Sequence, residues 1–196
     1  MDYSKPSRPE PRYVSDAVTV AAKILVVGHF AVGKTTFIGS LSEIAPLRTE
    51  ERMTQAAAHV DDLRGAPDKV TTTVALDFGR LTLSDDVVLY LFGTPGQQRF
   101  IQLWEDMARG ALGALILVDP VRLAESFPVI ELVEKYGLEY SIAVNSFTPE
   151  RYDEAEIREA LDLLPDTPVS YCDARSRESS GQALITLVRH LLTRTA

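Results

Sequence analysis

The chain has 196 residues, 45% of them hydrophobic and 24% charged, and it carries a formal net charge of -8. This composition excludes a disordered chain and favours one folded domain. The acidic balance, with no basic run, excludes charge-driven binding to nucleic acid or to an anionic membrane. No stretch approaches the roughly 18 apolar residues of a membrane span, and neither a signal segment nor a lipidation motif is visible. We therefore expect a cytoplasmic protein without a membrane anchor of its own, which only a partner would recruit to a membrane.

Residues 1–20 carry three prolines among polar residues, which predicts a disordered arm ahead of a domain over residues 21–196. Short apolar or alternating runs then predict six strands, at residues 24–27, 74–83, 87–92, 112–118, 141–144 and 169–172. Helical patterns reach about residue 44 after the first strand and recur at residues 123–136, 149–163 and 176–192. Turn residues 84–86 join the second and third strands as a hairpin. The alternation predicts a three-layer α/β fold with a six-stranded, mainly parallel sheet and one antiparallel edge strand.

The first strand is followed by GHFAVGKT, residues 28–35, which fits the phosphate-loop pattern GxxxxGK[ST]. A chance match is expected in roughly one in a hundred chains of this size, and more rarely between a strand and a helix. The loop amides and the helix N-terminus would face nucleotide phosphates, Lys34 would reach the β and γ phosphates, and Thr35 would ligate Mg²⁺. The predicted nucleotide-binding residues of this segment are Gly28, His29, Phe30, Ala31, Val32, Gly33, Lys34, Thr35 and Thr36.

A second motif, Gly93-Thr94-Pro95-Gly96-Gln97, ends the second strand of the hairpin. At that point the amide of Gly96 can bond a γ phosphate, and Gln97 can orient the attacking water as the catalytic residue. A Pro-Gly pair by itself marks only a turn, which is the alternative interpretation.

With these two motifs in this order, the chain resembles the Ras-superfamily small GTPases from about residue 22 to residue 192. Within them it is most similar to the actinobacterial conservon GTPases and, more distantly, to the bacterial polarity GTPases. The closer likeness lies in residues 71–78, 91–100 and 143–147. The resemblance implies a Ras-like GTP-binding domain that uses GTP/GDP and Mg²⁺, hydrolyses GTP and works as a signalling switch.

The same resemblance assigns roles to further residues. Thr73 matches the threonine that closes over Mg²⁺ and the γ phosphate, although a β-branched strand residue is the plainer interpretation. Asn145 opens the guanine-binding motif, unless it is only a turn residue after a strand. Asp173, Ala174 and Arg175 resemble the last motif, in which the amide of Ala174 would face the base.

Several positions depart from the Ras pattern. Gly93 stands where an aspartate usually holds a Mg²⁺-bound water, so the metal should be bound more weakly or by another residue. The guanine motif Asn-Lys-x-Asp is replaced by Asn-Ser-Phe-Thr at residues 145–148, where Phe147 could stack on the base instead. Phe30 would crowd the attacking water, which predicts slow hydrolysis. Arg99 is a candidate arginine finger or, alternatively, a solvated side chain.

Two other functions compete with the switch. An ATP-dependent enzyme could use Asp119, at the end of an apolar strand, as its acidic Mg²⁺ support. A non-hydrolysing module would keep the nucleotide as a structural ligand.

For the switch, the resemblance implies a roadblock-type dimeric regulator and a sensor-kinase-like membrane protein as partners. The polar segment 46–69 would elaborate the first switch, and the apolar stripe 100–107 is either core or a partner surface.

Overall fold

The computed structural model describes residues 17–45, 47–53, 72–94, 101–147 and 152–194. The strands are β1 (Val20–Val27), β2 (Leu47–Met53), β3 (Thr72–Thr82), β4 (Val87–Gly93), β5 (Gly113–Val118), β6 (Tyr140–Asn145) and β7 (Val169–Cys172). The helices are α1 (Lys34–Leu41), α2 (Ile101–Ala108), α3 (Phe127–Lys135), α4 (Glu154–Ala160) and α5 (Arg177–Arg194), with the 3-10 helix η2 (Leu123–Ser126) before α3. None of these helices is both long enough and apolar enough to cross a membrane.

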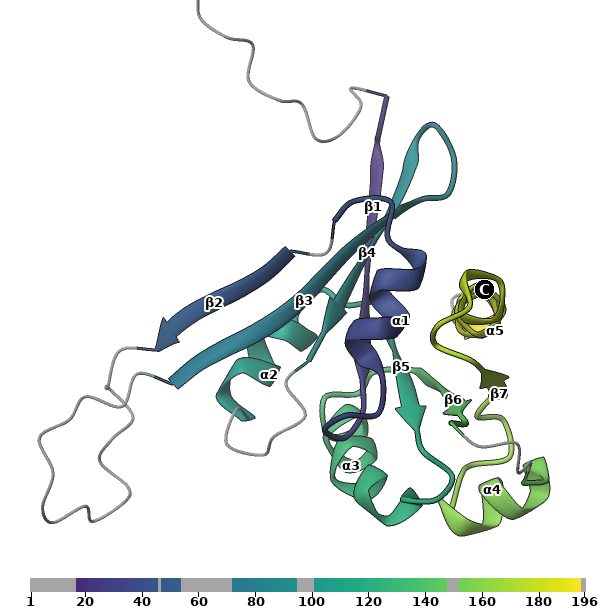
Figure 1. Cartoon of the computed structure of the whole chain (residues 1–196). Coiled ribbons are helices and arrows are strands. Elements are labelled where there is room, and N and C mark those ends of the chain that lie inside the picture. Colours follow the sequence, from purple (N-terminus) through teal and green to yellow (C-terminus); the bar gives the residue numbers. More distant parts are fainter. Residues whose placement is uncertain (1–16, 46, 54–71, 95–100, 148–151, 195–196) are drawn as a thin grey trace, which may run out of the picture.

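The strands form one sheet in the order β2-β3-β4-β1-β5-β6-β7 (Figure 1). Strands β4, β1, β5, β6 and β7 are mutually parallel, whereas β3 runs antiparallel to β4. The predicted three-layer α/β fold with an antiparallel strand in a mainly parallel sheet is therefore confirmed. Because parallel strands end at one edge of a sheet, the carboxyl ends of β1, β5, β6 and β7 lie along the same edge.

All six predicted strands are present, and β2 adds a seventh beyond β3. It lies in the polar segment expected to elaborate the first switch, and it pairs antiparallel with β3 from Leu47 opposite Phe78 to Met53 opposite Thr72. The edge strand is thus β2 rather than β3. Its sequence LRTEERM carries four charged residues and lacks an apolar run, so no strand was predicted, yet such charge is usual at a sheet edge.

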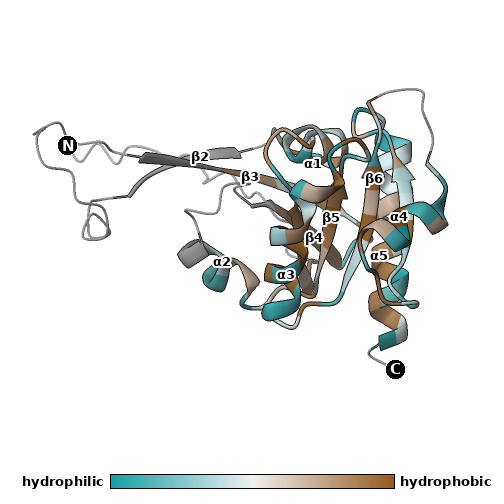
Figure 2. Cartoon of the chain, turned by 90° about the horizontal axis from the view of Figure 1, so that it is seen from below, coloured by the Kyte–Doolittle hydropathy of each residue, from teal (hydrophilic) through white to brown (hydrophobic). Residues whose placement is uncertain are grey.

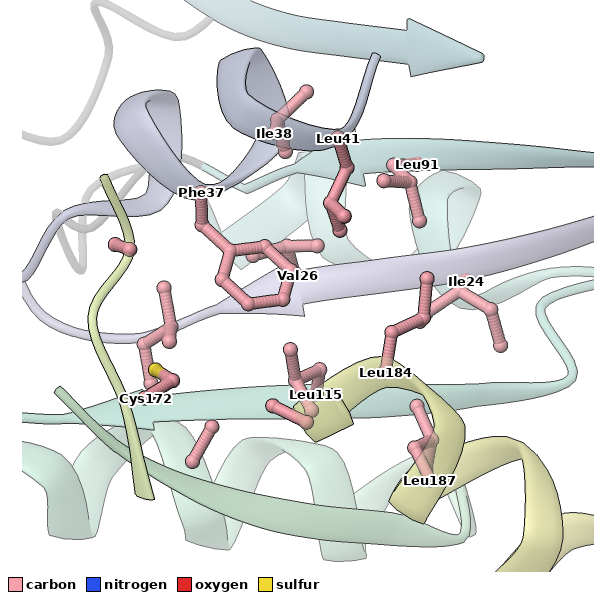
Figure 3. Close-up of a cluster of buried hydrophobic side chains, with 14 of the residues drawn as sticks. Ile24, Val26, Phe37, Ile38, Leu41, Leu91, Leu115, Cys172, Leu184 and Leu187 are labelled. Atoms are coloured by element: carbon pink, nitrogen blue, oxygen red, sulfur yellow. The ribbon is translucent and has the colours of Figure 1, made fainter. Parts of the chain in front are cut away.

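The two faces of the sheet carry separate apolar cores, because alternate strand residues point to opposite faces. On one face, Val26 packs with Phe37 of α1 and Leu184 of α5 (Figure 3). On the other face, Leu25 and Val27 pack in one cluster with residues of α2, α3 and α4. Each buried side chain of this size stabilises the fold by about 1.5–3 kcal/mol. Apolar residues accordingly line the central strands, and polar residues gather on the outer sides of the helices (Figure 2).

The chain enters the sheet close to the end of the expected arm. Residues 1–16 lie outside the described residues. The amides of Thr19 and Val20 both donate to the carbonyl of Asp86 at 3.0 Å, next to the start of β1. The first strand therefore begins at Val20, four residues before the apolar run that predicted it.

Candidate functional site

The loop between β1 and α1 is shaped by two glycines with positive φ. Gly28 has φ +146, and a Cβ there would lie 2.5 Å from the carbonyl oxygen of Leu117 on β5. Gly33 has φ +107, and a Cβ there would lie 2.6 Å from Nδ2 of Asn145 on β6. Side chains are excluded at both positions by backbone conformation and by contact. The loop can therefore lie directly against the ends of the two neighbouring strands.

Lys34 is the first residue of α1, and its side chain turns back into the loop. Its Nζ donates to the carbonyl oxygens of Gly28 and His29, both at 2.8 Å. Burial lowers the pKa of Lys34 to about 8, while the nearby carboxylate of Asp77 raises it. Gly33 is the N-cap residue of α1 and brings no capping side chain. The first-turn N–H groups and the Lys34 cation together make an anion-binding position.

Thr35 follows Lys34, and its hydroxyl meets a residue that the sequence did not single out. Oγ1 of Thr35 donates to Oδ2 of Asp77 on β3 at 2.5 Å. Thr35 is exposed and Asp77 is half-buried. Thr36, the next residue of α1, is also exposed. The site therefore brings a cation and a hydroxyl from the first turn of α1 together with a carboxylate from β3.

Asn145 is the last residue of β6, and its side chain links the phosphate loop to the segment that follows β7. Its Nδ2 donates to the carbonyl of Val32 at 2.8 Å, and its Oδ1 accepts from the amide of Ala174 at 3.0 Å. The side chain is only 1% exposed. The amide predicted to face a base is thus bonded to Asn145 in this structure. Phe147, two residues on, is 55% exposed, and its Cζ lies 3.7 Å from where a Cβ on Gly33 would be.

A paired acid and base lie at the same edge, after β7. Nε and Nη2 of Arg175 donate to the two carboxylate oxygens of Asp173, each at 2.8 Å. These bonds, together with the bond from the Arg175 amide, lower the pKa of Asp173 to about 2. Both side chains are exposed, so the pair adds little to stability and presents polar groups on either side of Ala174 in the chain.

The loop is also held from the side of β5. The ring of His29 is buried, with Nδ1 2.7 Å from the carbonyl of Phe30 and 3.3 Å from Oε2 of Glu125 on η2. Burial lowers the pKa of this histidine. Phe30 points outward and is 68% exposed, and Ala31 takes a positive φ of 62.

Asp119, the acid of the ATPase alternative, is already engaged. Its oxygens accept from the amide of Val121 and from Nε of Arg122, both at 3.0 Å. It is 7% exposed and closes the turn after β5. These contacts give Asp119 a structural role in that turn.

Several predicted residues cannot be placed in the site. Gly96, Gln97, Arg99 and Thr148 lie outside the described residues, and of Thr73 only the backbone is described, in β3 opposite Arg52. Trp104 and Met107 of the apolar stripe are buried in the core.

The cysteine Cys172, at the end of β7, is also buried, and burial raises the pKa of its thiol to about 12.

Residues 26–150 match the family described as "Conserved hypothetical ATP binding protein". The uncharacterized protein MJ1339 of Methanocaldococcus jannaschii is 30% identical over 137 residues, which cover 69% of this chain and 76% of that protein.

Among solved structures, the fold is similar to G domains of FeoB proteins. The G domain of the T. maritima FeoB iron transporter gives a TM-score of 0.62 at 16% identity, covering 87% of this chain and 98% of that domain. The FeoB G-domain from Methanococcus jannaschii gives a TM-score of 0.57 at 13% identity, covering 88% and 98%. At these identities the likeness shows the fold, which is that of a P-loop NTPase.

Proposed function

We propose that this chain, which belongs to the family of conserved hypothetical ATP binding proteins, is a P-loop nucleotide switch. In this proposal it binds GTP with Mg²⁺ and hydrolyses it slowly. The observation that carries the proposal is the position of Lys34. Its ammonium group lies inside the loop between β1 and α1, bonded to the carbonyls of Gly28 and His29. Such an arrangement, at the carboxyl end of a parallel sheet, is how phosphates are bound in this fold.

Each group of the loop and of the first turn of α1 has a phosphate oxygen or a metal ion that it could contact. Lys34 would exchange its two loop carbonyls for oxygens of the β and γ phosphates, and the first-turn amides of α1 would bond the remaining oxygens. The hydroxyl of Thr35 is an exposed hard oxygen beside a carboxylate, a donor set that suits Mg²⁺. When bound, Mg²⁺ would neutralise charge on the phosphate oxygens.

Hydrolysis needs a positioned water in addition to these phosphate contacts. The water oxygen would attack the γ phosphorus, the bond to the β–γ bridging oxygen would break, and GDP and phosphate would leave. We assign orientation of that water to Gln97, from the resemblance to Ras-like GTPases. The proposed slow intrinsic rate comes from the sequence position of Phe30, whose ring is 68% exposed on the loop and would have to turn toward the phosphates to crowd the water.

The choice of GTP rests on the edge formed by β6 and β7. Asn145 links the phosphate loop to Ala174, which is the role its place in the guanine motif implies. Phe147 and Arg175 are exposed beside it and would contact the two faces or the edge of a base. In the GTP state, Thr73 and Gly96-Gln97 would be ordered, and partners would bind this ordered form. The resemblance to conservon GTPases suggests a roadblock-type dimeric regulator and a sensor-kinase-like membrane protein as these partners.

An ATP-binding enzyme is the second candidate, and the description of the family favours it. The sequence suggested Asp119 as the Mg²⁺ support of such an enzyme. The structure weakens this assignment, because the Asp119 carboxylate is bonded to Arg122 and to the turn after β5. An ATP-specific chain would therefore have to use a different acid.

The phosphate site is tested by measuring the affinity of a fluorescent guanine nucleotide for the full chain and for Lys34→Ala. We expect a loss of at least about 100-fold, since a buried charge-assisted contact to phosphate is removed. Lys135→Ala, which removes an exposed lysine from α3, is the matched control and should bind normally. Equal affinity of the Lys34→Ala variant and the unmodified chain would refute the proposed site. Phosphate release measured on the same samples separates a hydrolysing switch from a module that only holds its nucleotide.

A further inference from the structure

We propose that Asp77, on β3, supplies the carboxylate of the Mg²⁺ site that Thr35 begins, in place of a side chain on the neighbouring strand at Gly93. This inference rests on the proposed nucleotide function and adds to it a residue of the metal site. It is carried by the register of β3 and β4, by the space around Gly93 and by the contact with Thr35.

Asp77 and Gly93 are directly opposite each other in the antiparallel pair β3–β4. Residues opposite each other in such a pair project to the same face of the sheet. Asp77 therefore delivers its carboxylate to the face and the level at which a side chain on residue 93 would stand. That face is covered by α1, whose Ile38 lies next to the Cβ positions of Gly93 and of Gly79 on the same two strands.

The space beside Gly93 is already occupied. A Cβ on Gly93 would lie 2.9 Å from Cβ of Asp77, 3.3 Å from its Oδ2 and 3.0 Å from Cδ1 of Ile38. Contacts near or below 3.0 Å do not occur between well-packed carbon atoms, so there is no room for a side chain on residue 93 while Asp77 keeps its position. The glycine at 93 and the aspartate at 77 are thus complementary features of one arrangement.

The carboxylate is aimed at the first turn of α1. Its Oδ2 accepts the hydroxyl hydrogen of Thr35 at 2.5 Å, and its charge acts on Lys34, whose cation lies in the phosphate loop. A hydroxyl and a carboxylate oxygen in contact, beside a phosphate position, form a hard oxygen pair. Mg²⁺ is commonly bound by one or two such protein oxygens together with phosphate oxygens and waters.

A purely structural role for Asp77 is the competing explanation, because a carboxylate near a helix N-terminus stabilises the helix. The variant Asp77→Asn separates the two. Its amide oxygen can still accept the Thr35 hydrogen bond, so the packing is kept, whereas the negative charge that a divalent cation requires is removed.

The test compares nucleotide affinity with Mg²⁺ and with a chelator in place of Mg²⁺, using the full chain and a fluorescent guanine nucleotide. We expect Asp77→Asn to reduce the Mg²⁺-dependent gain in affinity by about 10- to 100-fold, without weakening binding in the chelator. Asp85→Asn, in the exposed turn of the same hairpin, is the matched control and should retain the full gain.

A swap of the acid between the two strands provides the second arm. Asp77→Gly alone should lose the gain, and Asp77→Gly combined with Gly93→Asp should recover part of it, because removal of the Asp77 side chain opens the space that residue 93 needs. Gly93→Asp alone should lower the melting temperature. An unchanged Mg²⁺ gain in Asp77→Asn would overturn the inference while leaving the nucleotide function intact. Failure of the unmodified chain to bind any nucleotide would overturn both.

Discussion

Asn145 and Val32 are 113 residues apart in the sequence, and the carboxamide of the first is bonded to the backbone of the second. Nδ2 of Asn145 donates to the carbonyl of Val32 at 2.8 Å, in the phosphate loop just before Gly33. The same side chain accepts the amide of Ala174. One buried residue thus connects the loop that would hold phosphates with the segment that would meet a base, so the two halves of the site are mechanically coupled.

Replacing this residue should damage the fold and the site together. Asn145→Ala leaves the Val32 carbonyl and the Ala174 amide without their partner, and each buried unpaired group costs about 1–3 kcal/mol. We expect the free energy of unfolding, measured by urea titration, to fall by roughly 2–4 kcal/mol. The control is Ser170→Ala, which removes one half-buried bond to the Ile142 carbonyl and should cost about 1 kcal/mol. Equal losses in the two variants would contradict the bridging role.

A side chain at Gly33 should be more harmful than one at another glycine with positive φ. Gly33→Ala combines a strained backbone with a Cβ 2.6 Å from Nδ2 of Asn145. Gly137 has φ +65 with no described heavy atom within 4 Å of its Cβ position, so Gly137→Ala measures backbone strain alone, about 1–2 kcal/mol. We expect Gly33→Ala to cost about 2 kcal/mol more than this control and to weaken nucleotide binding, as urea and binding titrations would show. A Gly33→Ala variant as stable as Gly137→Ala would mean that the loop is not packed against Asn145.

Nucleotide affinity should depend on pH through Lys34. Burial lowers the pKa of this group to about 8, so the free protein loses its charge as the pH rises through that value. Phosphate favours the charged form, and binding above about pH 8 must therefore take up a proton. Affinity should fall by up to about tenfold for each pH unit above 8.

Calorimetric titrations between about pH 7 and about pH 9, in two buffers of different ionisation enthalpy, check this dependence. Proton uptake that grows with pH supports a Lys34 that is partly neutral before binding. No proton uptake at the alkaline end would contradict it.

The single cysteine should be unreactive in the folded protein. Burial raises the pKa of Cys172 to about 12, and only the thiolate is a nucleophile. Alkylation at about pH 8 should therefore be about a thousandfold slower in the folded chain than in the unfolded chain, where the thiol ionises near its ordinary value. Mass spectrometry of samples quenched with and without urea gives both rates. Fast modification without denaturant would show that β7 opens readily.

Local sequence patterns were sufficient for most of the fold. The apolar run at residues 24–27, followed by glycines and a lysine, predicted the strand, loop and helix that carry the phosphate site, because each feature depends only on near neighbours. The strand β2 was missed because LRTEERM has the composition of a solvated segment, and its strand character comes from pairing with β3.

Asp77 shows where the prediction of the site fell short. Gly93 was recognised as lacking an acid, but the replacement lies on another strand and depends on register. The turn at residues 84–86 puts Thr82 opposite Val88, and counting along both strands from that pair leads to Asp77 opposite Gly93. The contacts of Asn145 with Val32 and Ala174 could not be worked out in this way, since they depend on how the loops pack after the sheet has formed.

The central claim is tested most directly by calorimetric titration of nucleotide-free protein with GTP, GDP, ATP and ADP in the presence of Mg²⁺. We predict tight binding of GTP and GDP and at least about tenfold weaker binding of the adenine nucleotides, a difference of about 1.4 kcal/mol. Equal or stronger binding of ATP would contradict the proposed guanine switch and support the ATP-binding enzyme.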